Sequence, residues 1–278
     1  MATKSFTKTG KRISTTFSLN TFLFLVSASP AQAGDDAKAI MEEVFERKLP
    51  DTLSGTLQII TTDHANRQRR RTMRVINRRF EAASKTLMQF ESPPEVRNTG
   101  LLSVDYDSGD KNDDQWLYLP SLKKTTRIST RQRSGSFMGT DFTYADMTRS
   151  DPNHFNYKIL DANASVDGES CWKIEARPKT EKAKSETGYL KTEAWVSKSK
   201  KFVLQVKAWV IRGKRLKQIK FSNIEAKGKS FVAKKLFART LKGKKVESTT
   251  IMTYTNLKID DPSILESSFQ IQVLERGL

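Results

Sequence analysis

The stretch Lys201-Phe-Val-Leu-Gln-Val-Lys-Ala-Trp-Val-Ile211 decides the fold class of this chain. Apolar side chains occupy every second position, namely Phe202, Leu204, Val206, Ala208 and Val210. Strict alternation is typical of a β-strand that places one face on a core. Arg212-Gly213-Lys214 follows as a turn signal. The stretch therefore predicts a strand that leads into a hairpin.

The same two-residue period continues in both directions from this strand. It predicts further strands at 53–62, 69–80, 85–91, 101–106, 115–119, 157–161, 171–177, 189–196, 216–224, 231–240 and 245–255. Basic turns separate several of them, including Lys227-Gly228-Lys229 and Lys242-Gly243-Lys244. About a dozen strands in one twisted sheet cannot stay flat. The sequence therefore predicts a mainly β fold with one curled antiparallel sheet.

Helical patterns are few. Residues 36–49 predict an amphipathic helix, because apolar residues recur on one side and Pro50 ends the pattern. Short turns are expected near Tyr144–Met147 and at 262–269. The concave face of the sheet is therefore expected to stay apolar and to lie under a small helical lid. No linker interrupts the chain, so residues 34–278 are expected to form one domain.

Residues 1–33 are typical of a cleaved secretory signal peptide. Lys4, Lys8, Lys11 and Arg12 precede an apolar run from Phe17 to Ala28, and Ala31-Gln32-Ala33 has the small-residue pattern of a cleavage site. The alternative is an uncleaved N-terminal anchor. We expect cleavage near Ala33 and export to the periplasm. The chain has one cysteine, Cys171, which excludes an intrachain disulfide and is expected to lie in the core.

The formal net charge is +18, of which residues 1–33 contribute four positive charges. Export makes a nucleic acid partner improbable, so anionic lipid headgroups or acidic envelope polymers fit the charge better. Solubility alone is the plainer explanation of the same charge. For the arginine-rich stretches at 67–71 and 78–79, the default is a solvated convex face, and the alternative is a patch that docks on an anionic membrane or a partner. We expect a monomer.

Catalytic and metal-binding patterns are absent from the sequence. Two isolated histidines, His64 and His154, and one cysteine cannot supply a zinc site, and no nucleophile elbow or nucleotide-binding glycine motif occurs. The acidic stretch 105–114 departs from the calcium-binding register and is better explained as a turn. We expect a protein without a cofactor, a metal or an enzymatic activity.

Residues 113–147 combine a strand that ends at Pro120, a basic stretch and an apolar segment punctuated by glycines. Half of its large apolar side chains can be explained by core packing. Aromatic and methionine side chains also suit a cavity for acyl chains. The candidate ligand-binding residues of the cavity and lid are Trp116, Tyr118, Phe137, Met138, Phe142 and Tyr144.

This segment resembles the outer-membrane lipoprotein-sorting protein family, the relatives of the periplasmic lipoprotein carrier. The resemblance rests on Trp116-x-Tyr118-x-Pro120, then Arg127-Ile128, then the run from Ser136 to Met147. It implies a half-open β-barrel of about eleven strands whose concave face is covered by helices. It also implies transport of a lipid or lipoprotein acyl chain. Trp116 and Tyr118 would then lie on the barrel, and Phe137, Met138, Phe142 and Tyr144 on a lid-like segment.

Two functions follow from these observations. The first is a periplasmic carrier that shuttles a hydrophobic ligand, a lipid or lipoprotein acyl chains, towards or from the outer membrane. The alternative is a non-enzymatic accessory protein of an envelope lipid-export transporter in the inner membrane, with the cavity plugged by its own side chains.

Overall fold

The computed structural model describes residues 1–3, 30–107, 111–227 and 230–277, and within this part of the chain thirteen strands form one antiparallel sheet. The order of the strands is β6-β5-β4-β3-β2-β1-β13-β12-β11-β10-β9-β8-β7, and the sheet is not closed. The prediction of a single curled antiparallel sheet is confirmed. The strand number exceeds the expected eleven, partly because the short strand β6 has no alternating pattern that the sequence could reveal.

The first six strands lie in one half of the sheet. They are β1 (Thr52–Asp63), β2 (Gln68–Arg79), β3 (Ala83–Ser92), β4 (Gly100–Tyr106), β5 (Asp114–Leu119) and β6 (Lys124–Arg127). The other seven are β7 (Phe155–Val166), β8 (Glu169–Pro178), β9 (Tyr189–Ser197), β10 (Val203–Val210), β11 (Arg215–Lys227), β12 (Ser230–Lys242) and β13 (Lys245–Ile259). The pairing of β1 with β13 joins the two halves.

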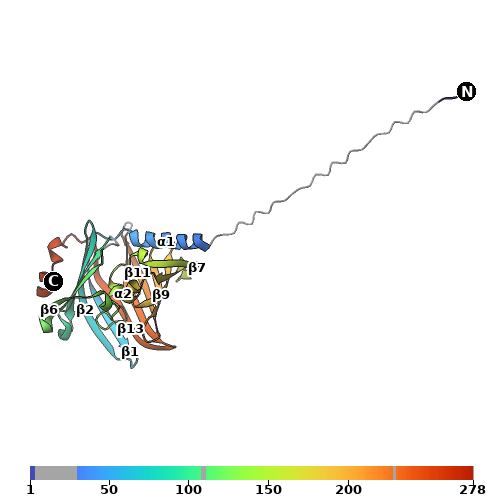
Figure 1. Cartoon of the computed structure of the whole chain (residues 1–278). Coiled ribbons are helices and arrows are strands. Elements are labelled where there is room, and N and C mark those ends of the chain that lie inside the picture. The colour runs from blue at the N-terminus through green and yellow to red at the C-terminus, as the bar shows by residue number, and fades with distance from the viewer. Residues whose placement is uncertain (4–29, 108–110, 228–229, 278) are drawn as a thin grey trace.

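Three α-helices accompany the sheet in the described residues: α1 (Pro30–Glu46), α2 (Glu181–Thr187) and α3 (Ile271–Arg276). Helix α1 begins at Pro30 and not at residue 36, and it lies across the upper edge of the sheet near β7 (Figure 1). Its side chains Ala37, Ile40 and Met41 pack against Ile174 and its neighbours on β8 and β9. The expected helix over the concave face is therefore present.

Helices α2 and α3 were not predicted from the sequence because each is short. The Thr180 side chain accepts a hydrogen bond from the Ala183 N–H and caps α2, and Gly188 ends it with a φ of 76°. Such a left-handed residue suits glycine because other side chains are strained there. The predicted turns near 144–147 and 262–269 appear as single 3-10 turns at Ala145–Met147 and Glu266–Ser268.

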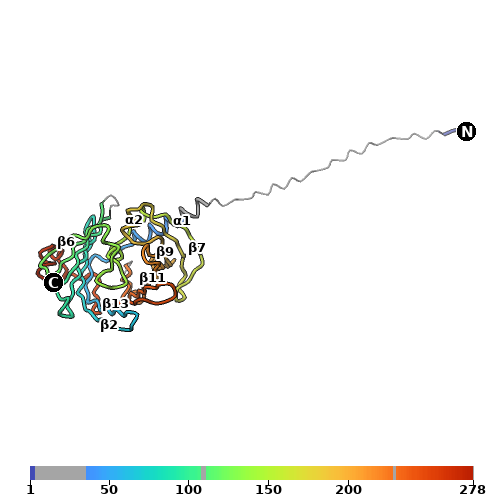
Figure 2. The backbone as a smooth tube through the Cα atoms, turned by 60° about the horizontal axis from the view of Figure 1, so that its bottom comes forward, coloured from blue at the N-terminus to red at the C-terminus, as the bar shows by residue number. Residues whose placement is uncertain are grey.

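The connection from β6 to β7 crosses the whole molecule, because these two strands are the opposite edges of the sheet. We call residues 128–154 the crossing segment. It runs inside the curve of the sheet (Figure 2). Phe137 and Phe142 are buried there against Met73 and Phe90 of the sheet. The crossing segment therefore fills the concave face over β1–β5.

The C-terminal residues 260–277 cover the other face of the same half-sheet. Ile264, Phe269 and Leu274 form a buried cluster with Leu87 and Leu102. Alternate residues of β3 and β4, such as Phe90 and Leu101, face the crossing segment instead. Strands β3 and β4 are thus buried on both faces, as a two-sided core requires.

One β-bulge changes the faces predicted for the opening stretch. The register of β10 against β9 shifts between Val203 and Gln205. An extra residue in one strand reverses the alternation beyond it. Val203 and Val206, which the sequence assigned to opposite faces, therefore line the same cavity.

Most of the predicted signal peptide falls in residues 4–29 and lies outside the described residues. Ala31–Ala33 belongs to the backbone of α1. Among the helices of the described residues, none has the length and apolar character needed to cross a membrane.

Candidate functional site

An apolar cavity of about 310 Å³ lies between the half-sheet β7–β12, helix α1 and the crossing segment. Its walls include Ile174, Val206, Ile219, Phe221 and Leu236 from four strands. This volume is at the lower end of small-molecule sites, which start near about 300 Å³. The cavity can therefore hold one narrow apolar group such as an acyl chain.

Small side chains on neighbouring strands hollow out this cavity. Tyr157 pairs with Ala176, and Ala176 pairs with Thr192, so the three stand in one row across β7, β8 and β9. All three line the cavity, and so does Ala194 one row further. Larger residues in place of Ala176, Thr192 and Ala194 would close the space. This row was not predicted, although Ala and Thr at alternate positions of neighbouring strands were a visible signal.

The roof of the cavity comes from two elements that are far apart in sequence. Helix α1 contributes Met41, and the crossing segment contributes Phe142, Ala145, Asp146 and Thr148. No hairpin of the sheet joins these roof elements to the wall. They are held to the wall by side-chain contacts.

A buried carboxylate fixes the crossing segment to the sheet. Asp141 accepts hydrogen bonds from the hydroxyls of Thr240, Ser248 and Thr250 on β12 and β13, and its own N–H donates to Thr250 Oγ1 at 2.9 Å. Asp141 is 4% exposed. A buried charge is tolerated when it is hydrogen-bonded in this way. The contacts fix the register of Phe137 and Phe142 over the sheet.

A second polar contact lies in the cavity wall. The Tyr189 hydroxyl donates to both carboxylate oxygens of Asp146, at 3.0 and 2.9 Å. Burial and the neighbouring Asp146 charge raise the pKa of Tyr189 well above its usual value. Burial lowers the pKa of Lys217, whose ammonium lies 5.7 Å from the Tyr189 ring centroid. These groups tie the crossing segment to the β9–β11 wall.

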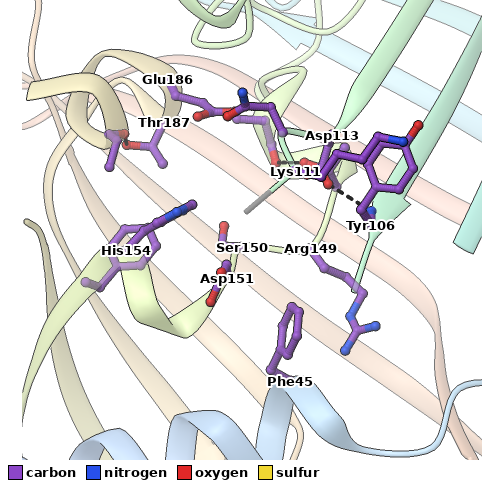
Figure 3. A pocket seen from close by; sticks show the side chains of 15 residues that line it. Phe45, Tyr106, Lys111, Asp113, Arg149, Ser150, Asp151, His154, Glu186 and Thr187 are labelled. Carbon is purple, nitrogen blue, oxygen red and sulfur yellow. Dashed lines mark hydrogen bonds between the residues drawn. The ribbon is translucent and has the colours of Figure 1, made fainter. Parts of the chain in front are cut away.

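A smaller cavity of about 270 Å³ adjoins the first and shares Met41, Tyr157, Val203 and Phe221 with it. It lies under the end of α1, where Phe45, Arg47 and Arg149 also line it. Figure 3 shows the Arg149 side chain beside the Phe45 ring, with the guanidinium carbon 4.2 Å from the ring centroid. Charged side chains thus stand beside the apolar wall at this end.

Acidic residues cluster near the same end, where β4 and β5 meet the crossing segment. Asp105 accepts a hydrogen bond from the Arg149 N–H at 3.3 Å. Burial and the nearby Asp113 charge raise the pKa of Asp105 to about 8. Asp113 accepts from the Tyr106 N–H (Figure 3), and burial raises its pKa to about 6. Asp105 is therefore mostly neutral at pH 7.

The structure separates the six predicted ligand-binding residues into two groups. Phe142 lines the larger cavity, and Phe137, Met138 and Tyr144 belong to the same packed cluster beside it. Met138 has a φ of 49°, in the left-handed region. Its carbonyl accepts a hydrogen bond from the Arg71 guanidinium on β2.

Trp116 and Tyr118 lie elsewhere. The sequence placed them with the cavity residues, but both pack with Phe269 and Leu274 on the face covered by the C-terminal segment. Leu117, between them, points to the crossing segment. The alternation of side chains along β5 was predicted from the sequence. The sequence did not predict which face of β5 points to the concave side of the sheet. Contact of any of the six residues with a ligand stays a prediction.

A metal site is not evident in the part of the chain that the structure describes, where no group of three His, Cys, Asp or Glu side chains is placed to hold an ion. Cys171 is fully buried in a cluster with Phe202 and Leu204.

The fold and the site together define a class: a half-open antiparallel β-barrel whose concave face holds an apolar cavity under a roof formed by α1 and the crossing segment. A family model described as "Uncharacterized protein" matches residues 82–276, and the chain belongs to this family. Its structural neighbours are outer membrane lipoprotein-sorting, DUF1329 and LolA superfamily proteins. The predicted resemblance to the outer-membrane lipoprotein-sorting protein family is thereby confirmed.

Three solved structures document this similarity. A domain from Vibrio parahaemolyticus described as an outer membrane lipoprotein-sorting protein is 26% identical, with a TM-score of 0.77, and the match covers 87% of this chain and 100% of that one. A DUF1329 family protein from Desulfovibrio piger is 24% identical over 89% and 100%, with a TM-score of 0.73. A LolA superfamily protein from Nitrosomonas europaea is 19% identical over 84% and 97%, with a TM-score of 0.59. No curated protein matches the sequence.

Proposed function

We propose that this protein is a non-enzymatic periplasmic carrier that binds a lipid or lipoprotein acyl chain in its concave cavity. The observation that supports the proposal is the apolar cavity of about 310 Å³ between the sheet and the roof formed by α1 and the crossing segment. The similarity to a domain described as an outer membrane lipoprotein-sorting protein supports it as well. The protein acts as a monomer after removal of residues 1–33, and moves cargo towards or from the outer membrane.

Burial of the chain supplies the affinity. Each methylene removed from water contributes about 0.8 kcal/mol. Release then requires a state that binds less tightly, and opening of the roof formed by Met41 and the crossing segment gives such a state. Phe142 and Tyr144 lie where this movement would change the cavity.

Purification of the exported protein from its native membrane environment tests the proposal. Lipid extraction and mass spectrometry are expected to detect about one acyl-bearing molecule per chain, and a fluorescent fatty-acyl probe is expected to bind the delipidated protein and to be displaced by this lipid. A protein that carries no lipid and binds no acyl probe would contradict the carrier function and would favour the accessory role in a transporter complex.

A membrane partner is supported by the charge on one edge of the sheet. The turns β1–β2, β10–β11 and β12–β13 lie side by side, because Asp63 pairs with Ser248 and Arg215 pairs with Lys242. These turns lie away from α1, at the bottom of Figure 1. We call the turns 63–68, 211–215 and 242–247, together with the β5–β6 turn 119–124, the hairpin edge.

Exposed apolar side chains occur among the cations of the hairpin edge. Leu122, Ile211 and Val246 are exposed by 66%, 38% and 42%. Cations flanking exposed apolar groups suit an anionic bilayer surface, where the former meet headgroups and the latter enter the interface. Of the cations at the hairpin edge, Arg67 pairs with Asp63 and Arg215 with Glu247. Lys242, Lys244 and Lys245 form no ion pair with a carboxylate of the described residues. At the opposite end, Lys200 pairs with Glu169 at 2.6 Å and Lys201 with Glu43 at 2.7 Å. The third predicted basic turn, at Lys227, lies at that opposite end.

The triple variant Lys242→Glu, Lys244→Glu and Lys245→Glu is expected to weaken binding to phosphatidylglycerol-containing vesicles at least about 30-fold, since each cation near an anionic surface contributes about 1 kcal/mol. Vesicle flotation measures this. Binding of the unchanged protein is expected to fall as salt rises, because the attraction is screened.

The matched control carries the same charge change at three exposed lysines away from the hairpin edge, Lys158, Lys179 and Lys235. It is expected to bind vesicles nearly as well as the unchanged protein. An equal loss in both variants would mean that net charge alone is responsible, and the hairpin edge would then have no special role.

A further inference from the structure

Two arginines line the smaller cavity from its roof side. Arg47 follows the last residue of α1, and Arg149 belongs to the crossing segment. The apolar side chains Phe202, Val203 and Phe221 line the same cavity from the sheet. Since this cavity shares its wall with the larger one, a molecule with its chain in the larger cavity can place its head beside the two guanidinium groups.

Neither arginine forms an ion pair with a carboxylate of the described residues. Arg47 donates one hydrogen bond, from Nη1 to the Phe231 carbonyl at 3.4 Å, and its guanidinium carbon lies 4.7 Å from the Phe202 ring centroid. The Arg149 guanidinium carbon lies 4.2 Å from the Phe45 ring centroid (Figure 3). Both guanidinium groups therefore retain most of their donors.

The positive charges of Arg47 and Arg149 repel each other. Burial and, as the smaller cause, the Arg149 charge together lower the pKa of Arg47 to about 10. Burial also lowers the pKa of Arg149. Both groups remain protonated at pH 7, so two positive charges stand close together in a partly desolvated place. Such an arrangement gains free energy when an anion binds between the charges.

Nearby carboxylates do not neutralise this pair fully. Asp107 is engaged by both nitrogens of Arg79, at 2.6 and 2.5 Å. Asp105 is mostly neutral at pH 7, as its raised pKa of about 8 requires. Asp151 accepts a hydrogen bond from the Asn153 N–H at 2.8 Å. Arg47 and Arg149 also line an outer groove, together with the acidic side chains Glu42, Glu46 and Asp51, which disfavour a polyanion there.

We propose that Arg47 and Arg149 bind the single anionic headgroup, a carboxylate or a phosphate, of an amphiphile whose acyl chain lies in the adjoining apolar cavity. This inference rests on the proposed carrier function and names the class of its cargo. Guanidinium groups suit both headgroups because they donate two parallel hydrogen bonds to a carboxylate or phosphate. The headgroup would also link α1 to the crossing segment, so bound cargo would hold the two roof elements together.

Three ligands with the same palmitoyl chain test the proposal: palmitate, 1-palmitoyl lysophosphatidic acid and uncharged 1-palmitoyl glycerol. The delipidated protein is expected to bind one or both anionic ligands at least about 30-fold more tightly than the glycerol ester, as two charge-assisted contacts imply. The double variant Arg47→Gln and Arg149→Gln is expected to lose this preference and to keep its affinity for the glycerol ester. Isothermal titration calorimetry measures both.

The control variant, Arg74→Gln and Arg131→Gln, removes the same charge from two exposed side chains and is expected to keep the preference. Equal binding of charged and uncharged ligands by the unchanged protein would overturn the headgroup site while leaving the carrier function intact. Failure of all three ligands to bind would instead count against the carrier function. A preference for palmitate or for the phosphate identifies which headgroup the site accepts.

Discussion

The variant Ala176→Trp is expected to lose fatty-acyl binding by roughly 60-fold. Ala176 stands between Tyr157 and Thr192 in the row that lines the floor of the larger cavity. An indole at this position would occupy the space of about three methylenes, and their burial contributes ~2.4 kcal/mol in total. Titration of the delipidated variant with a fluorescent acyl probe measures the loss.

Ala162→Trp is the matched control, because Ala162 is exposed on the edge strand β7. It is expected to bind the probe like the unchanged protein. Thermal unfolding of both variants separates a filled cavity from a damaged fold. Full probe binding by a folded Ala176→Trp protein would show that the acyl chain binds elsewhere.

The variant Asp141→Ala is expected to lower the free energy of unfolding by about 3 kcal/mol or more. The carboxylate accepts hydrogen bonds from Thr240, Ser248 and Thr250, and Thr250 is fully buried. Hydrogen bonds to a charged group contribute about 1.5–3 kcal/mol each, and unpaired buried hydroxyls add a further cost. Urea denaturation followed by tryptophan fluorescence measures the change.

Two further variants sharpen this prediction. Asp141→Asn keeps the shape and one acceptor oxygen, so a smaller loss is expected. Asp161→Ala removes an exposed carboxylate whose hydrogen bond is local, to the Asn163 N–H, and is expected to change the stability by less than about 0.5 kcal/mol. If Asp141→Ala is as stable as this control, the crossing segment is held by its apolar contacts alone.

Loss of Asp141 also bears on the roof of the cavity. Asp141 and Phe142 are adjacent in the chain. Loss of the hydrogen bonds to the Asp141 carboxylate is therefore expected to loosen the Phe142 side chain, which lines the cavity. The same variant therefore connects the stability of the crossing segment with the access of cargo to the cavity.

The strands could be predicted from sequence because their signal is local. Alternating residues in 69–80, 189–196 and 216–224 reflect a pleated backbone with one face on a core, and the structure places strands β2, β9 and β11 there. The short elements escaped prediction for the same reason. Strand β6 and helices α2 and α3 contain too few residues for a period to be read.

The candidate site could be predicted in part. The segment 136–147 was identified as apolar and out of place, and it does cover the concave face. The assignment of Trp116 and Tyr118 to this site depended on which face of β5 meets the crossing segment, and the alternation alone carries no such information. Arg47 and Arg149 were passed over, because 102 positions separate them in the chain.

The sequence by itself determined the period of each strand, the turns between strands and hence a wide antiparallel sheet that must curl. The tertiary structure decided that β6 and β7 are opposite edges, so that residues 128–154 must cross the concave face. It also decided that this segment fills the half over β1–β5 and leaves a cavity over β7–β12. The physical reason is that hydrophobic alternation is a local property, whereas a cavity depends on which distant side chains fail to meet.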